Sequence, residues 1–452
     1  MMKQCRQAGL VRRSEGFTLV ELMITMVIFV LVIAASSQIF IANLNAFKQQ
    51  SRIAESNIEG MAGLEMLRLD LEQAGYGLPW SVDTDGDGQA EVDWTLLAGY
   101  FEADATVSAG NPVNRSLYND ANNASGTAGN APRAVVAGNN VVRNPLVPNC
   151  TGANQAWCSD YLVIKATNIS TSPAASKWTY ITNTALGNIL QSPAAVPAAD
   201  LLQDDERVIA EIPETLTTPR TLLTNPLAGG AFFARFRTNL GLPFPAAFQP
   251  TAGTSAVRLV YGIDTNSDLR MPFNRADYYI STTNVPQRCA TGTGVLLKGI
   301  LNNTTAATGG TITTFLPLVD CVADMQVVFN LDTDLAGPPD TLSNADGTTA
   351  SGAANVATVQ ATLANATLLR QQLKEIRVYA LVQEGQRDPS FTFSGFTSVP
   401  LGGCATCIRV GDDVIPAGIG NYGNDFDLSV IPNYLNYRWK VFQMTVTPYN
   451  AR

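Results

Sequence analysis

Residues 12–40 read RRSEGFTLVELMITMVIFVLVIAASSQIF, in which two basic residues precede a long apolar run. From Phe17 to Phe40 the only charged residue is Glu21, and about 20 apolar residues are enough to span a bilayer as a helix. A secretory signal has a shorter apolar region with a cleavage site behind it. Here the cleavage-like feature, Gly16 before Phe17, lies ahead of the apolar run. The pattern therefore predicts a membrane helix that is retained.

The residues around this run predict its orientation. Four basic residues precede it and outweigh one acid: Lys3, Arg6, Arg12 and Arg13 against Glu15. By the positive-inside rule this end stays cytoplasmic and the chain after the run is exported. An acid within hydrocarbon is costly, so Glu21 is expected to have a partner, unless it is tolerated near the membrane interface or satisfied locally.

Helical periodicity continues beyond the membrane run, because no proline occurs until Pro79. Apolar residues recur at spacings of three, four or seven, as on one face of an amphipathic helix. This face comprises Phe47, Ala54, Ile58, Met61, Leu64, Leu67, Leu71 and Ala74. The pattern predicts one helix of about 58 residues from Phe17 to Ala74, about 87 Å long. Its second half is expected to pack against a β-sheet.

The remainder of the chain has the composition of an exported β-rich domain, with short β-like runs between Gly, Asn, Thr, Ser and Pro. Strands are predicted at residues 160–167, 255–263, 276–282, 324–331, 374–382 and 437–449, and a helix at residues 356–372. Polar, low-complexity stretches are expected to form loops around the sheet. The predicted fold class is thus α+β, with a long N-terminal helix on an antiparallel sheet.

Composition excludes several kinds of function. The chain contains 46% hydrophobic residues and has a net charge of −9, so a basic nucleic-acid-binding surface over the whole molecule is not indicated. It has no histidine, which removes Ser-His-Asp and Cys-His catalysis and His-ligated zinc. Paired carboxylates remain, but no nucleophile and base are visible together. We therefore expect the protein not to be an enzyme.

The seven cysteines become an even set of six if the segment containing Cys5 is removed. Proximity in sequence suggests the pairs Cys150–Cys158, Cys289–Cys321 and Cys404–Cys407, although six cysteines allow 15 connectivities. Reduced, buried thiols are the alternative and would suit a cytosolic protein better than an exported one. The CATC pair at residues 404–407 could also be redox-active, but no βαβ pattern surrounds it.

Two aspartate-rich turns have the spacing of calcium loops. In DTDGDGQAEVDW, Asp83, Asp85 and Asp87 take the first, third and fifth positions, and Gly88 the turn position. Gln89 would contribute its backbone carbonyl, and Glu91 would bind directly or through water. Position twelve is Trp94 and Asp93 is one place short, so a structural calcium loop is favoured over an EF-hand. A solvated acidic turn is the alternative.

The second turn is DTNSD, where the same spacing recurs at Asp264, Asn266 and Asp268, but Leu269 replaces the glycine. A third and sparser set comprises Asp332 and Asp334, with Asp340 as a more remote ligand. Calcium is the cofactor predicted for these sites, with an affinity suited to the millimolar calcium outside cells.

The segment GFTLVELMITMVIF closely resembles the processing site and first helix of type IV pilins and pseudopilins. This resemblance implies cleavage between Gly16 and Phe17 by a dedicated peptidase, which also methylates the new N-terminus. Glu21 becomes the fifth mature residue, about 6 Å along the helix from Phe17. The family assigns it to pairing with the Phe17 amine of a neighbouring subunit. Glu15 departs from the basic residue that is commoner before the glycine.

Further segments resemble the PilW class of minor pilins: LEQAGYG at residues 71–77, VADMQVVFNLDTD at 322–334, KEIRVYALV at 374–382 and the C-terminal YRWKVFQMTVTPYNAR. The predicted divisions are a cleaved leader (1–16), the long helix (17–76, transmembrane to about 40), a variable β-rich region with a calcium-type loop (77–255), and a PilW-like β-rich region (256–452).

The resemblance implies a minor pilin that primes or caps pilus assembly at the tip and supports adhesion, twitching motility or DNA uptake. Its partners would be other major and minor pilins, the prepilin peptidase and a tip adhesin. It would lie in the inner membrane with a periplasmic domain, and later in the extracellular pilus. The alternatives are a J-like pseudopilin of type II secretion and a membrane-anchored adhesin or ligand-binding module.

Overall fold

The structure is a computed structural model that describes residues 16–87, 89–91, 94–97, 99–105, 113–121, 130–184, 187–191, 201–237, 244–251, 255–352, 355–397, 404–412 and 422–449. It divides into two compact units, residues 1–55 and 56–452. The boundary falls inside the first helix, α1 (Leu19–Glu72). The predicted leader lies outside the described residues, apart from Gly16.

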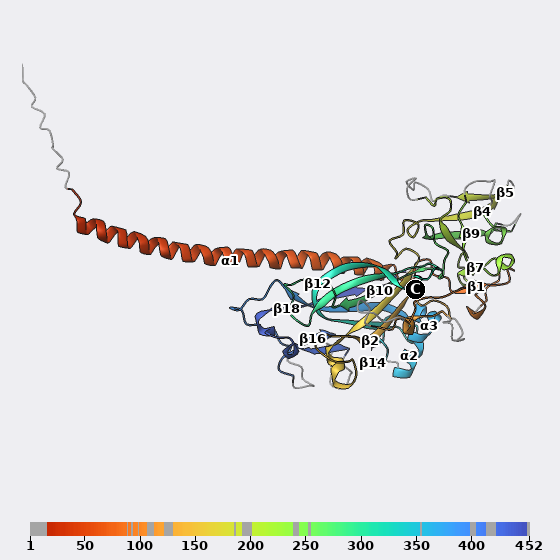
Figure 1. Cartoon of the computed structure of the whole chain (residues 1–452). Helices are drawn as coiled ribbons and strands as arrows, with labels where there is room; N and C mark the ends of the chain where they lie inside the picture. Colours follow the sequence, from red (N-terminus) through yellow and green to blue (C-terminus); the bar gives the residue numbers. More distant parts are fainter. Residues whose placement is uncertain are drawn as a thin grey trace, which may run out of the picture. The chain divides into compact units, whose positions relative to one another are not determined.

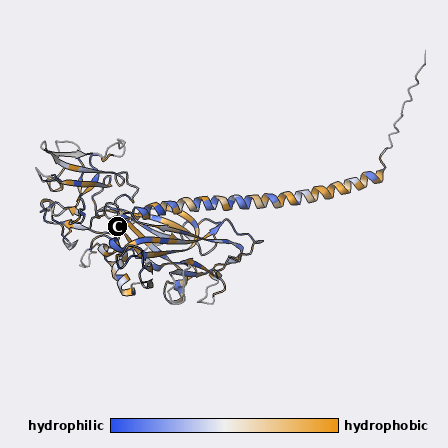
Figure 2. Ribbon diagram, turned by 180° about the vertical axis from the view of Figure 1, so that it is seen from behind, coloured by the Kyte–Doolittle hydropathy of each residue, from blue (hydrophilic) through white to orange (hydrophobic). Residues whose placement is uncertain are grey.

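Helix α1 is one uninterrupted element of 54 residues. Its N-terminal part is long and apolar enough to cross a membrane, and its side chains there are exposed. Figure 2 shows this part as predominantly hydrophobic, with hydrophilic residues interspersed further along the helix. Gly75 and Gly77 follow its end with positive φ angles of 82° and 64°, a backbone conformation that glycine adopts without steric cost. The predicted helix is therefore confirmed, two residues shorter at each end.

Only half of the predicted apolar stripe is buried. Leu64, Leu67, Leu71 and Ala74 are at most 9% exposed and belong to the main hydrophobic core. Ile58 and Met61, which belong to the same unit as the sheet, are exposed, and the prediction that they face it is wrong. Phe47 and Ala54 belong to the first unit and are exposed there. Within residues 56–74 the buried face instead begins at Gly60 and Gly63. Glycine has no side chain to contribute to an apolar pattern, so the predicted stripe did not include these two residues.

The larger sheet carries nine strands and includes most of the strands predicted from sequence (Figure 1). Its main path runs β14 (Ala350–Gly352), β13 (Thr341–Asn344), β12 (Ile312–Leu331), β11 (Gly294–Leu301), β10 (Asn274–Ser281), β3 (Cys158–Ala166) and β2 (Val135–Arg143). β15 (Leu373–Glu384) pairs with β12 and with β18 (Arg438–Val446). All of these pairs are antiparallel. The predicted α+β fold with an antiparallel sheet is thus confirmed.

A second sheet has the order β1 (Ser81–Asp83), β7 (Thr221–Leu223), β6 (Arg207–Ile212), β9 (Val257–Asp264), β4 (Trp178–Thr184) and β5 (Gly187–Gln191), with β8 (Ala234–Arg235) also on β6. Its only parallel pair among the described strands is β1 with β7. β16 (Cys407–Gly411) and β17 (Gly423–Asp427) form a separate hairpin. Short 3-10 turns connect the strands: η1 (Trp94–Leu96), η2 (Arg115–Tyr118), η3 (Gly152–Trp157), η5 (Pro226–Ala228), η6 (Ala246–Phe248), η7 (Leu428–Val430) and η8 (Tyr434–Asn436).

The helix predicted at residues 356–372 is two helices, α2 (Val356–Ala364) and α3 (Ala366–Gln372). Asn365 lies between them with an extended backbone, and its side chain accepts hydrogen bonds from the amides of Thr367 and Leu368. An asparagine in this position caps a new helix instead of continuing the old one. The sequence pattern missed the break because both helices keep their apolar residues in phase.

The predicted boundary at residue 255 does not separate two folding units. β2 and β3 from the first region pair with β10 from the second, whereas β9 from the second lies between β6 and β4. One hydrophobic core joins residues of both sheets. The two predicted regions therefore form a single folded body with α1 residues 56–72.

A buried network of charges fixes the loops between β1 and β2 against the larger sheet. The ammonium of Lys165 on β3 lies 2.7 Å from Glu102 and 2.6 Å from Asp120, and all three side chains are at most 3% exposed. Arg275 on β10 contacts Glu102 at 3.1 Å and Asp277 at 2.7 Å. Because these cations lie beside it, the pKa of Glu102 falls to about 2 in spite of its burial.

Candidate functional site

The N-terminal end of α1 holds the residues predicted to act in processing and assembly. Gly16 and Phe17 precede the helix and are exposed. A peptidase can reach a cleavage site only if the site is exposed. Thr18 is the cap: its hydroxyl accepts the Glu21 amide at 3.3 Å, and Glu21 Oε2 accepts the Thr18 amide at 3.0 Å. The Thr18 hydroxyl also donates to Glu21 Oε2 at 2.9 Å. This reciprocal arrangement is a capping box.

Glu21 therefore has a local partner within its own chain. The alternative that this acid is satisfied locally describes the isolated subunit. Its pairing with a neighbouring subunit's Phe17 amine remains a prediction. The two states are compatible, since a carboxylate has two oxygens and both Thr18 contacts fall on Oε2. Sequence reasoning missed the Thr18 contact, although the Thr-x-x-Glu spacing was a visible signal.

Further along α1, Asp70 connects the helix to the larger sheet. Its Oδ2 accepts hydrogen bonds from the Lys298 ammonium at 2.7 Å and from the Tyr278 hydroxyl. Lys298 on β11 and Tyr278 on β10 are directly paired across the two strands. Burial, with the Asp70 carboxylate beside it, raises the pKa of Tyr278 well above its ordinary range, so its hydroxyl keeps its proton and donates. This contact sets how residues 56–72 lie against the sheet.

The first predicted calcium loop brings together three of its predicted ligands. One carboxylate oxygen each from Asp83, Asp85 and Asp87 lies within 4.8 Å of the other two. Backbone amides hold them in place: Gly86 donates to Asp83 at 2.7 Å, Asp87 to Asp85 at 3.0 Å and Gln89 to Asp87 at 2.7 Å. Asp83 is buried at the end of β1, whereas Asp85 and Asp87 are exposed.

The remaining predicted ligands of this loop lie differently. Glu91 is outside the carboxylate group, and its Oε2 accepts the amide of Thr84 at 3.0 Å as well as its hydroxyl. The backbone of Glu91 pairs with Val82 in an isolated bridge, which closes the loop at its base. Gly88 and Asp93 are outside the described residues. In this structure, Glu91 closes the loop and contacts Thr84.

At the second predicted calcium turn the acids have other partners. Asp264 Oδ1 accepts the amides of Asn266 at 2.9 Å and Ser267 at 2.8 Å, as in an Asx turn. Asp268 Oδ1 accepts Arg207 Nε at 3.1 Å. These contacts account for the two aspartates without an ion, and calcium at this turn stays a prediction.

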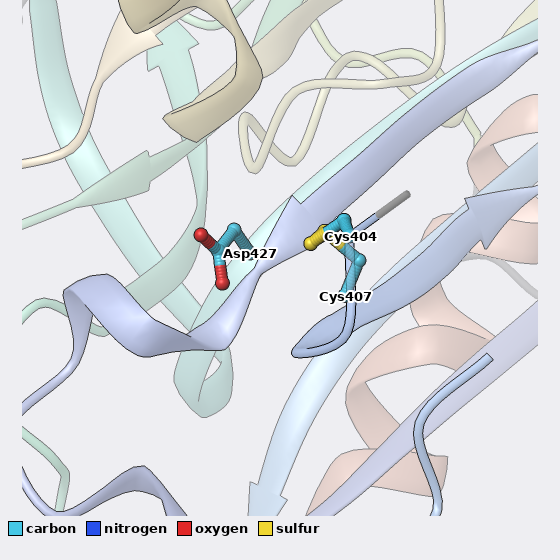
Figure 3. A group of neighbouring side chains, drawn as sticks. All are labelled: Cys404, Cys407 and Asp427. Atoms are coloured by element: carbon cyan, nitrogen blue, oxygen red, sulfur yellow. A yellow bond between two sulfur atoms is a disulfide. The ribbon is translucent and has the colours of Figure 1, made fainter. Parts of the chain in front are cut away.

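The six cysteines after α1 form three disulfides, Cys150–Cys158, Cys289–Cys321 and Cys404–Cys407, as proximity in sequence suggests. Figure 3 shows the last of these beside Asp427, a grouping with the composition of a metal site. The sulfurs are bonded to each other, so neither is a thiolate ligand. Asp427 accepts the Thr406 hydroxyl at 2.5 Å and caps η7 through Ser429. This group has a structural role.

Comparison with known proteins assigns the N-terminal region. A family model described as the prokaryotic N-terminal methylation motif matches residues 11–37. The N-terminus is that of a type IV pilin-like protein. The match covers Gly16, Phe17 and Glu21, so the resemblance found in the sequence is confirmed at this level, whereas the PilW class remains a prediction.

The other comparisons add less. A solved structure, the type IV-like pilin TTHA1219 from Thermus thermophilus, is similar at 11% identity with a TM-score of 0.20. The alignment covers 40% of this chain and 66% of that chain, which is just under two thirds of its length. No curated protein matches. The assignment therefore depends on the methylation motif and on the helix that carries it.

Proposed function

We propose that this protein is a minor pilin of a type IV pilus, of the PilW class, that primes or caps assembly at the tip. The observation that carries the proposal is the methylation motif at residues 11–37, which leads directly into the long apolar helix α1. A pilin or pseudopilin role follows from the motif. The position at the tip and the PilW class come from the sequence resemblance.

The proposed assembly step depends on charge pairing inside an apolar environment. Cleavage after Gly16 creates an α-amine at Phe17, and Glu21 places a carboxylate one helical turn away. In a stack of α1 helices, the Glu21 of one subunit pairs with the Phe17 amine of the next. Two charges that are each costly in hydrocarbon offset one another. Thr18 holds the Glu21 carboxylate near the helix start until that partner arrives.

The exported unit is proposed to act as a surface and a binding partner. Its three disulfides suit an oxidising compartment. In this role the protein moves from the inner membrane, with a periplasmic domain, into the extracellular pilus. It contacts major and minor pilins, the prepilin peptidase and a tip adhesin, and supports adhesion, twitching motility or DNA uptake. This role is structural and requires no catalytic residue.

Two measurements in the native host test this role: the identity of the N-terminal residue, and the effect on assembly of removing the charge of Glu21. Mass spectrometry should find a chain beginning at Phe17 and N-methylated there. Glu21→Gln should still be cleaved but should fail to enter fibres, whereas Glu55→Gln, a charge-matched change on the exposed surface of α1, should assemble normally. An intact leader, or normal incorporation of Glu21→Gln, would contradict the proposed role.

A J-like pseudopilin of type II secretion remains the alternative, because the same motif precedes both kinds of subunit. Deletion of the chain separates them: loss of surface pili with normal secretion supports the pilus, and the reverse supports the pseudopilus. A membrane-anchored adhesin or ligand-binding module, the other alternative, is compatible with the pilin role, because a pilin can also carry a binding surface. We also propose that the loop at residues 83–91 binds a structural calcium ion, on the strength of the three gathered carboxylates.

A further inference from the structure

The loop between β12 and β13 gathers three carboxylates at the end of the larger sheet. β12 ends at Leu331 and β13 begins at Thr341, and the amide of Asp340 donates to the Leu331 carbonyl at 2.8 Å. Asp332 and Asp340 therefore lie at the two ends of a closed hairpin, next to each other. One carboxylate oxygen each from Asp332, Asp334 and Asp340 lies within 4.8 Å of the other two.

Asp332 is the unusual member, because it is buried and incompletely bonded. Its side chain is 1% exposed. Oδ2 accepts the amide of Gly337 at 3.1 Å and lies 3.4 Å from the Lys374 ammonium. Among the residues that the structure describes, nothing donates a hydrogen bond to Oδ1. A buried carboxylate oxygen without a donor is costly, and native proteins seldom leave one so. Oδ1 thus requires a partner that is not a described side chain or amide.

The other two acids complete one side of a cation site. Asp340 is partly buried, and both of its oxygens accept the Thr333 hydroxyl, at 2.9 and 3.0 Å. Asp334 is exposed, and its Oδ1 accepts the Ala336 amide at 2.9 Å. The site therefore has a buried acid on its inner side and an exposed acid at its mouth, where solvent can supply further oxygen ligands.

The charge of the site favours a divalent cation. Three carboxylates face one ammonium, that of Lys374, and two negative charges remain. Lys374 is 29% exposed and also donates to the carbonyl of Gln371 at 3.1 Å, so it has another position available when a cation enters. Calcium accepts six to eight oxygen ligands in flexible geometry, whereas magnesium demands a near-ideal octahedron. An irregular loop with carboxylate and water oxygens suits calcium better.

We propose that Asp332, Asp334 and Asp340 form a second calcium site, independent of the loop at residues 83–91 and of the pilus role. In this site calcium occupies the space beside Asp332 Oδ1 and joins the two ends of the β12–β13 hairpin. Lys374 opposes the cation electrostatically and sets its affinity.

The test uses the full mature chain in detergent, carrying Asp85→Ala and Asp87→Ala so that the first loop does not contribute. After removal of metal with EDTA, bound calcium is measured by equilibrium dialysis and elemental analysis at about 1 mM calcium, the range of extracellular sites. The loop of Asp332, Asp334 and Asp340 should bind one ion per chain. Asp334→Asn should lose this ion, because the change removes one of the three carboxylates. Asp334 is exposed, so the fold should stay intact. Asp346→Asn, a charge-matched change in the next turn, where Asp346 accepts from Thr348, should keep it.

Two further measurements make the result decisive. Lys374→Met should bind calcium more tightly, because it removes the competing positive charge. If the loop held no calcium site, neither the background protein nor its Lys374→Met variant would bind calcium there. Magnesium at the same concentration should bind at least tenfold more weakly. The proposal is overturned if the background protein binds no calcium, if Asp334→Asn binds as much as Asp346→Asn, or if magnesium binds equally well.

Discussion

Gly63 of α1 lies directly against the backbone of Leu318 on β12. A Cβ atom added to Gly63 would be 1.9 Å from the Leu318 carbonyl oxygen and 2.5 Å from its carbonyl carbon. Backbone atoms cannot turn aside as a side chain does, so only glycine permits this approach of the helix to the strand. One turn earlier, Gly60 has room: the nearest atom to an added Cβ is Val319 Cγ1, at 3.8 Å.

These two glycines provide a matched pair of variants. Gly63→Ala should lower the free energy of unfolding by about 1–3 kcal/mol, because the helix must move away from β12. Gly60→Ala should leave it unchanged or raise it by up to about 1 kcal/mol, since alanine favours the helix and meets only ordinary contact. Thermal unfolding followed by tryptophan fluorescence measures both. Equal stability of the two variants would show that the helix does not approach Leu318 this closely.

The same two glycines show where prediction from sequence ends. The length of α1, its membrane-like start and the strands rich in Val, Ile and Tyr were predictable, because apolar periodicity reports which faces are buried. Only half of the face of α1 that meets the sheet was predicted. Gly60 and Gly63 also belong to this face, but a glycine has no side chain and so adds nothing to the apolar pattern. The pairing of β9 with β6 and β4 could not be predicted either, because it depends on contacts between segments distant in sequence.

Stability should depend on pH through Glu211, a fully buried acid on β6. It lies 3.8 Å from Arg220 Nε, and neither of its oxygens accepts a hydrogen bond from the described residues. Burial raises the pKa of Glu211 from 4.5 to about 8, in spite of Arg220. The folded state therefore holds a proton that the unfolded state releases above its lower pKa. The stabilisation is complete below about pH 4.5 and is lost as the pH rises to about 8.

Glu211→Gln should flatten this dependence, because glutamine stays neutral in both states. Each unit of separation between the folded and unfolded pKa contributes about 1.4 kcal/mol. At pH 8 the variant should be more stable than the parent, and below pH 4.5 the two should be similar. Glu214→Gln, which removes the same charge from a more exposed side chain, should keep the parent's slope. Urea unfolding at several pH values measures this, and a parent without any slope would contradict the raised pKa.

Calcium binding at the first loop should require Asp85 and Asp87 together. Calcium at ten times its dissociation constant should stabilise the fold by about 1.4 kcal/mol per site. The double variant Asp85→Ala with Asp87→Ala should lose one such contribution. Glu91→Gln should retain it, because Glu91 contacts Thr84 and is not one of the three gathered carboxylates. Melting temperatures with calcium and with EDTA measure the effect. An undiminished response in the double variant would exclude this loop.

The candidate site was predictable only where its residues are neighbours in the chain. Gly16, Phe17 and Glu21 lie within one short motif, and Asp83, Asp85 and Asp87 lie within one turn. The buried ion pairs of the fold, by contrast, join residues that are far apart in the sequence. Lys165 contacts Glu102 and Asp120, which lie 63 and 45 positions before it, and no local spacing indicates that these residues meet. Such a network becomes visible only when β3 and the loops before β2 are placed together.

Substitution of Lys165 should destabilise the fold, because this lysine is buried between two acids. It is 0% exposed and neutralises two buried carboxylates, Glu102 and Asp120. Lys165→Met keeps the length of the side chain but leaves these acids with less compensation. We expect a loss of about 3–5 kcal/mol, as for other buried pairs that lose one partner. Lys440→Met is the control: Lys440 is 48% exposed and lies 3.3 Å from Glu384, so its loss should cost less than about 1 kcal/mol. Equal losses in the two variants would show that the network around Lys165 does not hold the loops to the sheet.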